Sequence, residues 1–308
     1  MEVLVIRKNN MWIIKNRKIF YTFSSILVAI VIGLLFTWGI RFGIDFTGGS
    51  LLEMSFEGEV PTHQELSIEL GNYDFLSGYS IRSSGDNNEI LRTKEITDEQ
   101  KNLLLTGLQE KYSVSEERFS TIGPTLGDEL KSKSAMAVLL ALVLIVMFIA
   151  FAFRHVSKPV SSWKYGGITV IAFLHDLIIP LGAFSVMGHF VGLEVDSLFI
   201  TALLVILGYS INDTIVVFDR IRENLSEIPD EQKDRRFEDV VGHSVNETIS
   251  RSLNTSLTTL LALVALYIFG GAVTQAFSLA LIVGVVAGTY SSIFLASPLL
   301  VSWNNRKK

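Results

Sequence analysis

Six apolar stretches, each long enough to cross a lipid bilayer as a helix, constrain this chain more than any other feature of its sequence. A bilayer core of about 30 Å requires roughly 20 apolar residues in helical conformation. Of the 308 residues, 49% are hydrophobic and only 19% are charged, which favours an integral membrane protein. The sequence predicts transmembrane helices at residues 19–40, 134–153, 166–187, 196–218, 253–270 and 275–300.

Lysine and arginine are distributed unevenly between the segments that connect these spans. They are frequent in the N-terminal residues 1–18, in the loop at 219–250 and in the tail at 301–308, whereas the short loops GHFVGLEV and GGAVT contain none. Because short cytoplasmic loops carry an excess of Lys and Arg, we expect both termini in the cytoplasm and the first span retained as an anchor. The chain is therefore predicted to be a multi-pass protein of the cytoplasmic membrane.

The long polar segment at residues 41–133 lies on the outer side of the membrane in this topology. Its strand-like and helix-like runs follow one another in the order β-α-β-β-α-β, and Thr97 with Gln100 is predicted to form a capping box at the second helix. That order is typical of the ferredoxin-like arrangement. The predicted fold class is an α-helical membrane protein with six transmembrane helices plus a small α+β ferredoxin-like extracytoplasmic domain.

Ionisable residues inside the predicted spans are candidate functional groups, because a charge near the bilayer centre costs about 2.5–3.5 kcal/mol. Asp213 lies in the fourth span, in LLVILGYSINDTIVVFDR, and is surrounded by the polar residues Ser210, Asn212 and Thr214. Such neighbours can hydrate the carboxylate or form hydrogen bonds to it, so Asp213 is a candidate proton switch. The alternative interpretation is a structural polar contact that joins two helices.

Arg251 lies at the cytoplasmic start of the fifth span, which runs antiparallel to the fourth. With a rise of 1.5 Å per residue, the depths of Asp213 and Arg251 match within about two helical turns. The sequence therefore allows an ion pair in which Asp213 titrates opposite an arginine that stays charged. The alternative is an arginine whose charged end reaches the membrane interface.

Asp176, beside His175 in the third span, is a second candidate for a proton relay. The sequence around Asp176 shows no polar strip, and Pro180 close by favours a kink in the helix. These features make a relay role weaker for Asp176 than for Asp213.

Two further patterns lie in the last two spans. Asn254 and Thr255 belong to a polar run that either lines a hydrated path or forms hydrogen bonds between helices. Gly284 and Gly288 form a G-x-x-x-G motif, which favours close packing of helices.

The sequence indicates neither enzymatic nor metal chemistry. The chain has no cysteine, its five histidines show no metal-ligand spacing, and GIDFTGGS lacks the G-K-[ST] ending of a phosphate-binding loop. We therefore predict that the protein is not an enzyme and uses no cofactor or metal ion. The net charge of −5 by itself would argue against nucleic acid as a partner, but the total is a poor guide here because the charges are segregated along the chain.

Several segments resemble hallmarks of the SecD/SecF family, and of its SecF members in particular. GIDFTGGS contains Asp45, Gly48 and Gly49, and TIGPTLGDEL contains Gly123 and Pro124. The most specific matches are LLVILGYSINDTIVVFDRIREN and ETISRSLNTSLTTL. The resemblance covers nearly the whole chain and places it within the resistance-nodulation-division superfamily.

This resemblance implies a partnership with SecD, the SecYEG channel and a translocating polypeptide, and further with YajC and YidC. It implies that the proton gradient, acting through Asp213, Arg251 and an aspartate of SecD, promotes late-stage translocation and release of polypeptides. The family usually has Arg-Thr where this chain has Arg251 and Ser252, a mild departure. Two alternatives are a proton-driven exporter of small molecules or lipids and a non-transporting scaffold for SecD and the channel. The small acidic outer segment disfavours the exporter.

Overall fold

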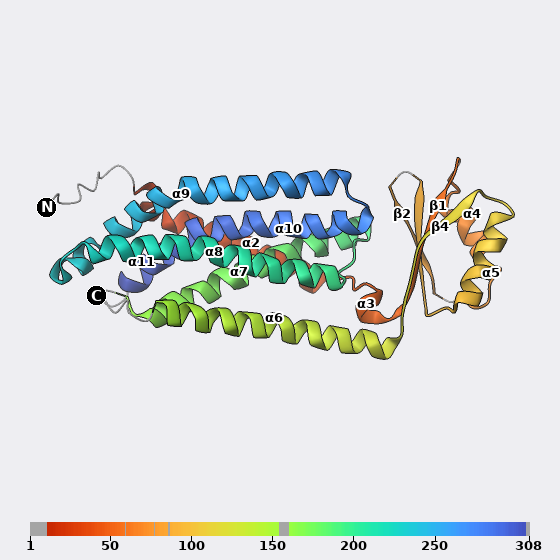
Figure 1. The fold of residues 1–308 in the computed structure, drawn as a ribbon, viewed down its shortest axis with the longest axis horizontal. Helices are drawn as coiled ribbons and strands as arrows, with labels where there is room; N and C mark the ends of the chain where they lie inside the picture. The colour runs from red at the N-terminus through yellow and green to blue at the C-terminus, as the bar shows by residue number, and fades with distance from the viewer. Residues whose placement is uncertain (1–10, 59, 77, 86, 154–159, 306–308) are drawn as a thin grey trace. The chain divides into compact units, whose positions relative to one another are not determined.

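The computed structural model describes residues 11–305 except 59, 77, 86 and 154–159 (Figure 1). The chain forms two compact units. The helical unit comprises Met1–Ile40, Ala137–His189 and Phe199–Lys308, and the α/β unit comprises Arg41–Met136 and Phe190–Leu198.

Long helices dominate the chain (Figure 1). Among the described residues, six helical stretches are long and apolar enough to cross a membrane. The sixth of these stretches joins two α-helices through a π-helical segment, η2. The helices of this group are α1 (Trp12–Lys15), α2 (Arg17–Thr37), α6 (Pro124–Ala152), α7 (Ser162–Val191), α8 (Ser197–Ser226), α9 (Asp230–Phe269), α10 (Ala272–Tyr290), η2 (Ser291–Ala296) and α11 (Ser297–Asn305).

The predicted loop at 219–250 is a helical hairpin in the structure. Helix α8 continues past residue 219, and α9 begins at Asp230 and runs unbroken into the apolar stretch that follows. The hydropathy pattern did not predict the helical turns of α8 and α9 between residues 219 and 250. Charged residues alternate there with Phe237, Val240 and Val245, which are buried. Hydropathy measures which part of a helix is apolar and does not detect where the helix itself ends.

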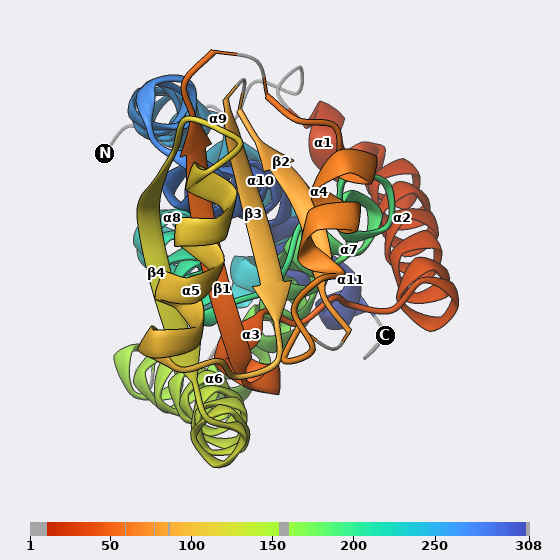
Figure 2. The ribbon, with the colours of Figure 1, turned by 90° about the vertical axis from the view of Figure 1, so that its right-hand side faces the viewer.

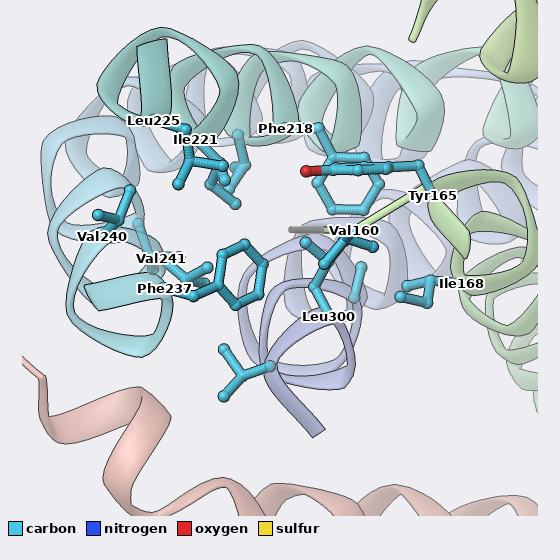
Figure 3. Close-up of a cluster of buried hydrophobic side chains, with 14 of the residues drawn as sticks. Val160, Tyr165, Ile168, Phe218, Ile221, Leu225, Phe237, Val240, Val241 and Leu300 are labelled. Atoms are coloured by element: carbon cyan, nitrogen blue, oxygen red, sulfur yellow. The ribbon is translucent and has the colours of Figure 1, made fainter. Parts of the chain in front are cut away.

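A cluster of buried apolar side chains fixes this hairpin to the rest of the helical unit (Figure 3). The cluster lies at the end of the unit where α1 contacts α9 and α11. Phe237 and Val241 of α9 contribute to it together with Leu300 of α11. The Tyr165 ring of α7 meets the Phe218 ring of α8 edge-on, with their centroids 5.1 Å apart. The hairpin is therefore part of the packed bundle.

The α/β unit consists of a four-stranded sheet with two helices on one of its faces (Figure 2). The sheet order is β2-β3-β1-β4, and every neighbouring pair is antiparallel. Twelve buried apolar residues, among them Leu52, Leu66 and Leu104, form its core. The elements are α3 (Ile44–Thr47), β1 (Gly49–Phe56), α4 (His63–Leu70), β2 (Ser80–Ser84), β3 (Asn88–Thr93), α5 (Asp98–Gln109) and β4 (Val114–Ile122).

Both helices of this unit begin with a reciprocal capping box. The predicted box at Thr97 and Gln100 is confirmed, and Thr62 with Glu65 forms a second one at α4. The hydrogen bonds that Glu65 accepts from the backbone and side chain of Thr62 lower the pKa of its carboxyl group. These local contacts explain why α4, only eight residues long, begins where it does.

The paired glycines Gly48 and Gly49 lie where α3 turns into β1, and both have positive φ angles, +70° and +119°. A Cβ atom on Gly48 would lie 2.9 Å from the Cα atom of Pro124, and one on Gly49 would lie 2.6 Å from the carbonyl oxygen of Thr93. The backbone here needs glycine for its conformation, and also for the close approach of Gly48 to the start of α6 and of Gly49 to the end of β3. Gly123 meets no such restriction, since its nearest contact would be Glu95 at 3.8 Å.

Asp45 in α3 forms a link to the first residue of α8. Its Oδ2 atom accepts a hydrogen bond from the Ser197 backbone N–H at 2.9 Å and another from the Ser197 hydroxyl. A carboxylate at a helix N-terminus satisfies a free backbone donor and interacts favourably with the helix dipole. The motif residues Asp45, Gly48, Gly49 and Pro124 therefore have structural roles in joining α3, β1, α6 and α8.

We expect Gly48→Ala to destabilise the protein more than Gly78→Ala does. Both glycines have φ near +70°, so both substitutions incur the same backbone penalty of about 1–2 kcal/mol. Only the Gly48 methyl group collides with neighbouring backbone, which adds about 1–3 kcal/mol, whereas a Gly78 Cβ has no atom within 4 Å. Thermal unfolding of the full chain in detergent measures both variants, and equal losses would contradict the close-approach explanation.

Candidate functional site

A group of buried polar side chains runs between helices α7, α8, α9 and α10 and the η2 segment. We call this group the polar seam, and its members are Asp176, Ser210, Asp213, Thr214, Ser252, Ser256, Thr289, Ser291 and Ser292. Buried polar groups in a membrane segment are expensive unless they find partners within the protein. The partners of each member therefore show what the seam can do.

Asp176 is fully buried and accepts hydrogen bonds from two other helices. Its Oδ2 atom accepts from the Ser210 hydroxyl at 2.5 Å and from the Ser291 hydroxyl at 2.8 Å, and its Oδ1 atom lies 3.0 Å from Nδ1 of His175. The sequence around Asp176 shows no polar strip, and yet the folded chain surrounds this carboxylate with polar partners, because Ser210 and Ser291 come from distant positions in the sequence. Asp176 is the most highly connected carboxylate of the seam.

The π-helical segment η2 supplies two consecutive serines to the seam. Ser291 reaches Asp176, while Ser292 shares a hydrogen bond of 2.8 Å with Thr214 of α8. Widening of a helix by one residue per turn changes which side chains face the neighbours, and such segments often occur at functional sites. In this wider turn the Ser297 hydroxyl donates to the carbonyl of Ser292, five residues earlier.

Two glycines allow α10 to approach α8 closely beside the seam. A Cβ on Gly284 would lie 2.2 Å from Cδ1 of Ile206, and one on Gly288 would lie 2.9 Å from Cβ of Ser210. The close packing predicted from the G-x-x-x-G motif is confirmed. Because the contact is close, the hydroxyl of Ser210 lies within reach of Asp176 and of the residues that follow Gly288.

Asp213 is 4% exposed and faces α9, where Ser252 is its side-chain neighbour. Among the described residues, however, Asp213 Oδ2 and Ser252 Oγ both lack a hydrogen bond of good geometry. A buried carboxylate oxygen without a donor is unfavourable. Among the described residues of the seam, Asp213 therefore differs from Asp176, whose two carboxylate oxygens both have side-chain partners.

The predicted ion pair between Asp213 and Arg251 is not formed in the part of the chain that the structure describes. Arg251 is exposed, and Ser252 takes the position facing Asp213. Consecutive helical residues point about 100° apart, so similar depth along the helix did not ensure the same face. The side chain of Arg251 lines an open cavity of about 550 Å³ together with Val216, Asp219, Arg220, Glu223, Glu247 and Thr248.

A network of charged and polar side chains, which the sequence analysis did not identify, closes one wall of this cavity. Arg220 of α8 makes a bidentate contact with Glu247 of α9, with both distances 2.8 Å, and also pairs with Glu223 at 2.6 Å. Asn224 donates to Glu247 as well, at 2.9 Å. Only the Arg220–Glu223 spacing of three residues could have been noticed in the sequence. The network ties α8 to α9 about two to three turns from Asp213 along α8.

The residues predicted to form a polar lining separate into two groups. Ser210 and Thr214 are buried in the seam, whereas Asn212, Asn254 and Thr255 are exposed on their helices. The buried position in α9 is taken by Ser256, which shares a hydrogen bond of 2.6 Å with Thr289. The three exposed residues therefore lie on surfaces that this chain does not cover by itself.

Two SecF proteins resemble this chain over nearly its full length. A protein translocase subunit SecF from Thermobaculum terrenum is 40% identical over 305 residues, which cover 96% of this chain and 94% of that protein. Protein translocase subunit SecF from Sebaldella termitidis is 38% identical, covering 96% and 92% of the two chains. The match to both proteins extends across the two units described above.

Solved structures of SecDF also match. SecDF from Thermus thermophilus, a translocon-associated membrane protein, is 33% identical and superposes with a TM-score of 0.83 over 99% of this chain. SecDF in a super-membrane-facing form is 34% identical, with a TM-score of 0.66. This chain spans 40% of each of those SecDF chains.

We expect Ser291→Ala to destabilise the helical unit by about 1 kcal/mol, because it removes a hydrogen bond between helices from a buried carboxylate. Ser278→Ala is the matched control, since the Ser278 hydroxyl bonds only to carbonyls of its own helix. Thermal unfolding in detergent compares the two variants. A loss for Ser278→Ala as large as that for Ser291→Ala would refute a special role of the contact to Asp176.

Two family models locate the resemblance along the chain. The model for the protein export membrane protein SecD/SecF, C-terminal, matches residues 103–306, which hold the entire polar seam. The model for the SecD/SecF GG motif matches residues 33–60, which contain Gly48 and Gly49. This chain therefore belongs to the SecD/SecF family of protein export membrane proteins and is one of its SecF members.

Proposed function

We propose that this chain, together with SecD, uses the proton motive force to promote late-stage translocation and release of polypeptides across the cytoplasmic membrane. The observation that carries the proposal is the environment of Asp213. Its carboxyl group is buried, one of its oxygens lacks a donor, and a cavity lined by Arg251 lies beside the same pair of helices. Such a group changes its hydrogen bonding when it gains or loses a proton.

The energy available from proton movement is sufficient for this role. One elementary charge that moves through 100 mV releases about 2.3 kcal/mol. An equilibrium between two conformations that differ by a few kcal/mol can be shifted by that amount, provided the proton favours one of them. When Asp213 is protonated, its carboxyl O–H can donate a hydrogen bond to Ser252 Oγ. A protonated Asp213 no longer attracts a cation, whereas an ionised Asp213 favours an approach of Arg251.

The connections of the helices offer a way to convey this change to the α/β unit. Helix α2 ends four residues before that unit begins, and α6 starts two residues after β4. In the proposed cycle, movement of the helices tilts the α/β unit, which holds a polypeptide in one state and releases it in the other. The two SecDF structures match this chain at nearly equal identity but with TM-scores of 0.83 and 0.66, which supports more than one arrangement in the family.

We propose SecD as the partner of this chain, because relatives named SecDF contain the matching region within a longer chain. SecDF of Thermus thermophilus carries in one chain the region that this chain matches. Helix α9 exposes Arg251, Asn254 and Thr255 together with the apolar Leu253 and Leu257. We propose that SecD covers this surface and supplies a further aspartate near Arg251. The SecYEG channel, YajC and YidC are proposed as further partners of the assembled complex.

Several other features are proposed on the same basis. The excess of Lys and Arg in the N-terminal segment, the α8–α9 hairpin and the tail supports cytoplasmic termini. Strand order β2-β3-β1-β4 with two covering helices supports a ferredoxin-like class for the α/β unit. We also propose that the protein is not an enzyme and works without a cofactor. For Asp176 we propose a role as a positioning group or as a second proton site.

We predict that Asp213→Asn and Arg251→Met both abolish the proton-gradient-dependent part of polypeptide release. The asparagine cannot exchange a proton, and the methionine removes the fixed positive charge. The measurement is release of a translocating chain from membrane vesicles that contain SecD and the channel, with and without a proton gradient.

Asp234→Asn is the control, since it removes an exposed carboxylate from the charged beginning of α9. Its release should keep the wild-type response to the gradient. Unchanged gradient dependence in both Asp213→Asn and Arg251→Met would refute the proposed mechanism, and the scaffold alternative would then explain the family role better.

A further inference from the structure

A cluster of arginines in the α/β unit is unused by the proposed function. Arg41, Arg82 and Arg92 line a cavity of about 290 Å³ together with Gly192 and Glu194. We call this cavity the arginine pocket. Arg82 and Arg92 lie on the sheet face opposite to α4 and α5, because Arg92 alternates along β3 with the core residue Leu91. Figure 2 shows α4 and α5 on the other face. His63 of α4 also lines the pocket, beside the edge strand β2.

The positive charges in the arginine pocket exceed the negative ones. Three guanidinium groups line it, and Glu194 is the single carboxylate among its described lining residues. Arg92 pairs with Glu194 and also donates to Thr47 Oγ1 at 2.6 Å. Burial raises the pKa of Glu194, and the charges of the three arginines oppose that shift. With Glu194 ionised, the lining still carries two more positive than negative charges.

Arg82 is half-buried, and its described hydrogen-bond partner is neutral. Its Nη1 atom donates to the carbonyl oxygen of Gly192 at 2.8 Å, and no carboxylate among the described residues lies within 4.0 Å of its guanidinium group. An arginine has five N–H donors and does not lose its charge in proteins. The nearest counter-charge, Glu194, is already paired with Arg92. A half-buried cation with free donors is therefore stabilised when a further anion joins it.

The side chain of Arg41 also approaches Gly192, the residue that accepts from Arg82. A Cβ atom on Gly192 would lie 3.8 Å from Nη1 of Arg41 and 3.6 Å from Cδ of Arg82. The φ angle of Gly192 is +70°, so the loop turns here in a conformation that glycine adopts readily. Two arginine side chains therefore converge on one loop residue that has no side chain of its own, which leaves room beside them.

The other acidic groups near this sheet face are engaged elsewhere. Glu53 on β1 accepts from Ser84 and Asn88, and Glu89 is buried and bonded to His63 and Ser83 at the rim of the pocket. The excess of two positive charges therefore suits a ligand that carries one to two negative charges and several acceptor oxygens. Arginine binds both phosphate and carboxylate in bidentate geometry. A phosphate group meets the requirement better, because it has more acceptor oxygens and can accept from two guanidinium groups at once.

We propose that the arginine pocket binds a phosphate group through Arg41 and Arg82, and that the headgroup of an anionic phospholipid supplies it. Arg41 follows the last residue of α2 by four positions, and Gly192 follows the last residue of α7 directly. Both helices are candidate membrane spans, so the pocket is connected to two span ends by very short segments. The proposal does not depend on the proton mechanism described above.

Calorimetric titration of the full chain in dodecyl maltoside with inorganic phosphate tests the shared chemistry. We expect saturable binding, weakened by about tenfold or more in Arg82→Gln and in Arg41→Gln, since each removes charge-assisted hydrogen bonds. Arg118→Gln is the matched control, because Arg118 is an exposed arginine of β4 outside the pocket. Arg41 is exposed, so Arg41→Gln should fold normally and keeps the test valid if Arg82→Gln does not.

A second arm distinguishes the two sources of phosphate. The melting temperature of the full chain is compared in nanodiscs of phosphatidylcholine alone and in nanodiscs that also contain phosphatidylglycerol. A rise with phosphatidylglycerol that is lost in Arg41→Gln and kept in Arg118→Gln supports the lipid headgroup. Phosphate binding in detergent without that rise assigns the pocket to free phosphate and overturns the lipid source. Absence of saturable phosphate binding, equal binding of acetate, or equal weakening by Arg118→Gln would overturn the pocket itself.

Discussion

The hydrogen bonds between Asp176 and the hydroxyls of Ser210 and Ser291 connect the helical segments α7, α8 and η2. No water is available in a bilayer core to satisfy a carboxylate, so its partners must come from the protein. The two serines and the adjacent histidine fulfil this requirement. The arrangement of α7, α8 and η2 relative to one another follows from it, since moving any of them leaves a polar group unpaired.

Small residues make this arrangement possible. Gly284 and Gly288 let α10 approach α8, and the π-helical turn then presents Ser291 and Ser292 to that helix. Association of helices in a membrane depends on close packing and on hydrogen bonds between them, because apolar side chains gain little by leaving lipid. The seam combines both contributions. Asp213, one turn from Ser210 along α8, stands apart because its second oxygen lacks a donor.

The sequence predicted several local features correctly because their causes are local. The capping box at Thr97 and Gln100 was recognised from residues three positions apart. Close packing at Gly284 and Gly288 was predicted from their spacing alone. The pairing of Asp213 with Arg251 failed in the isolated chain because similar depth along two helices does not fix which faces meet. The neighbours of Asp176 could not be predicted at all, since Ser210 and Ser291 lie 34 and 115 residues away.

The amino-acid sequence by itself determined that the chain has six apolar stretches and an α/β segment, because length and hydrophobicity suffice for both. It also determined the glycines of the GG motif, whose spacing and residue type are visible in the sequence. Only the tertiary structure decided which polar groups share the seam, how far α8 and α9 extend, and that three arginines surround one cavity. The physical reason is that hydrogen bonds and charges act over a few ångströms in space, whatever their separation along the chain.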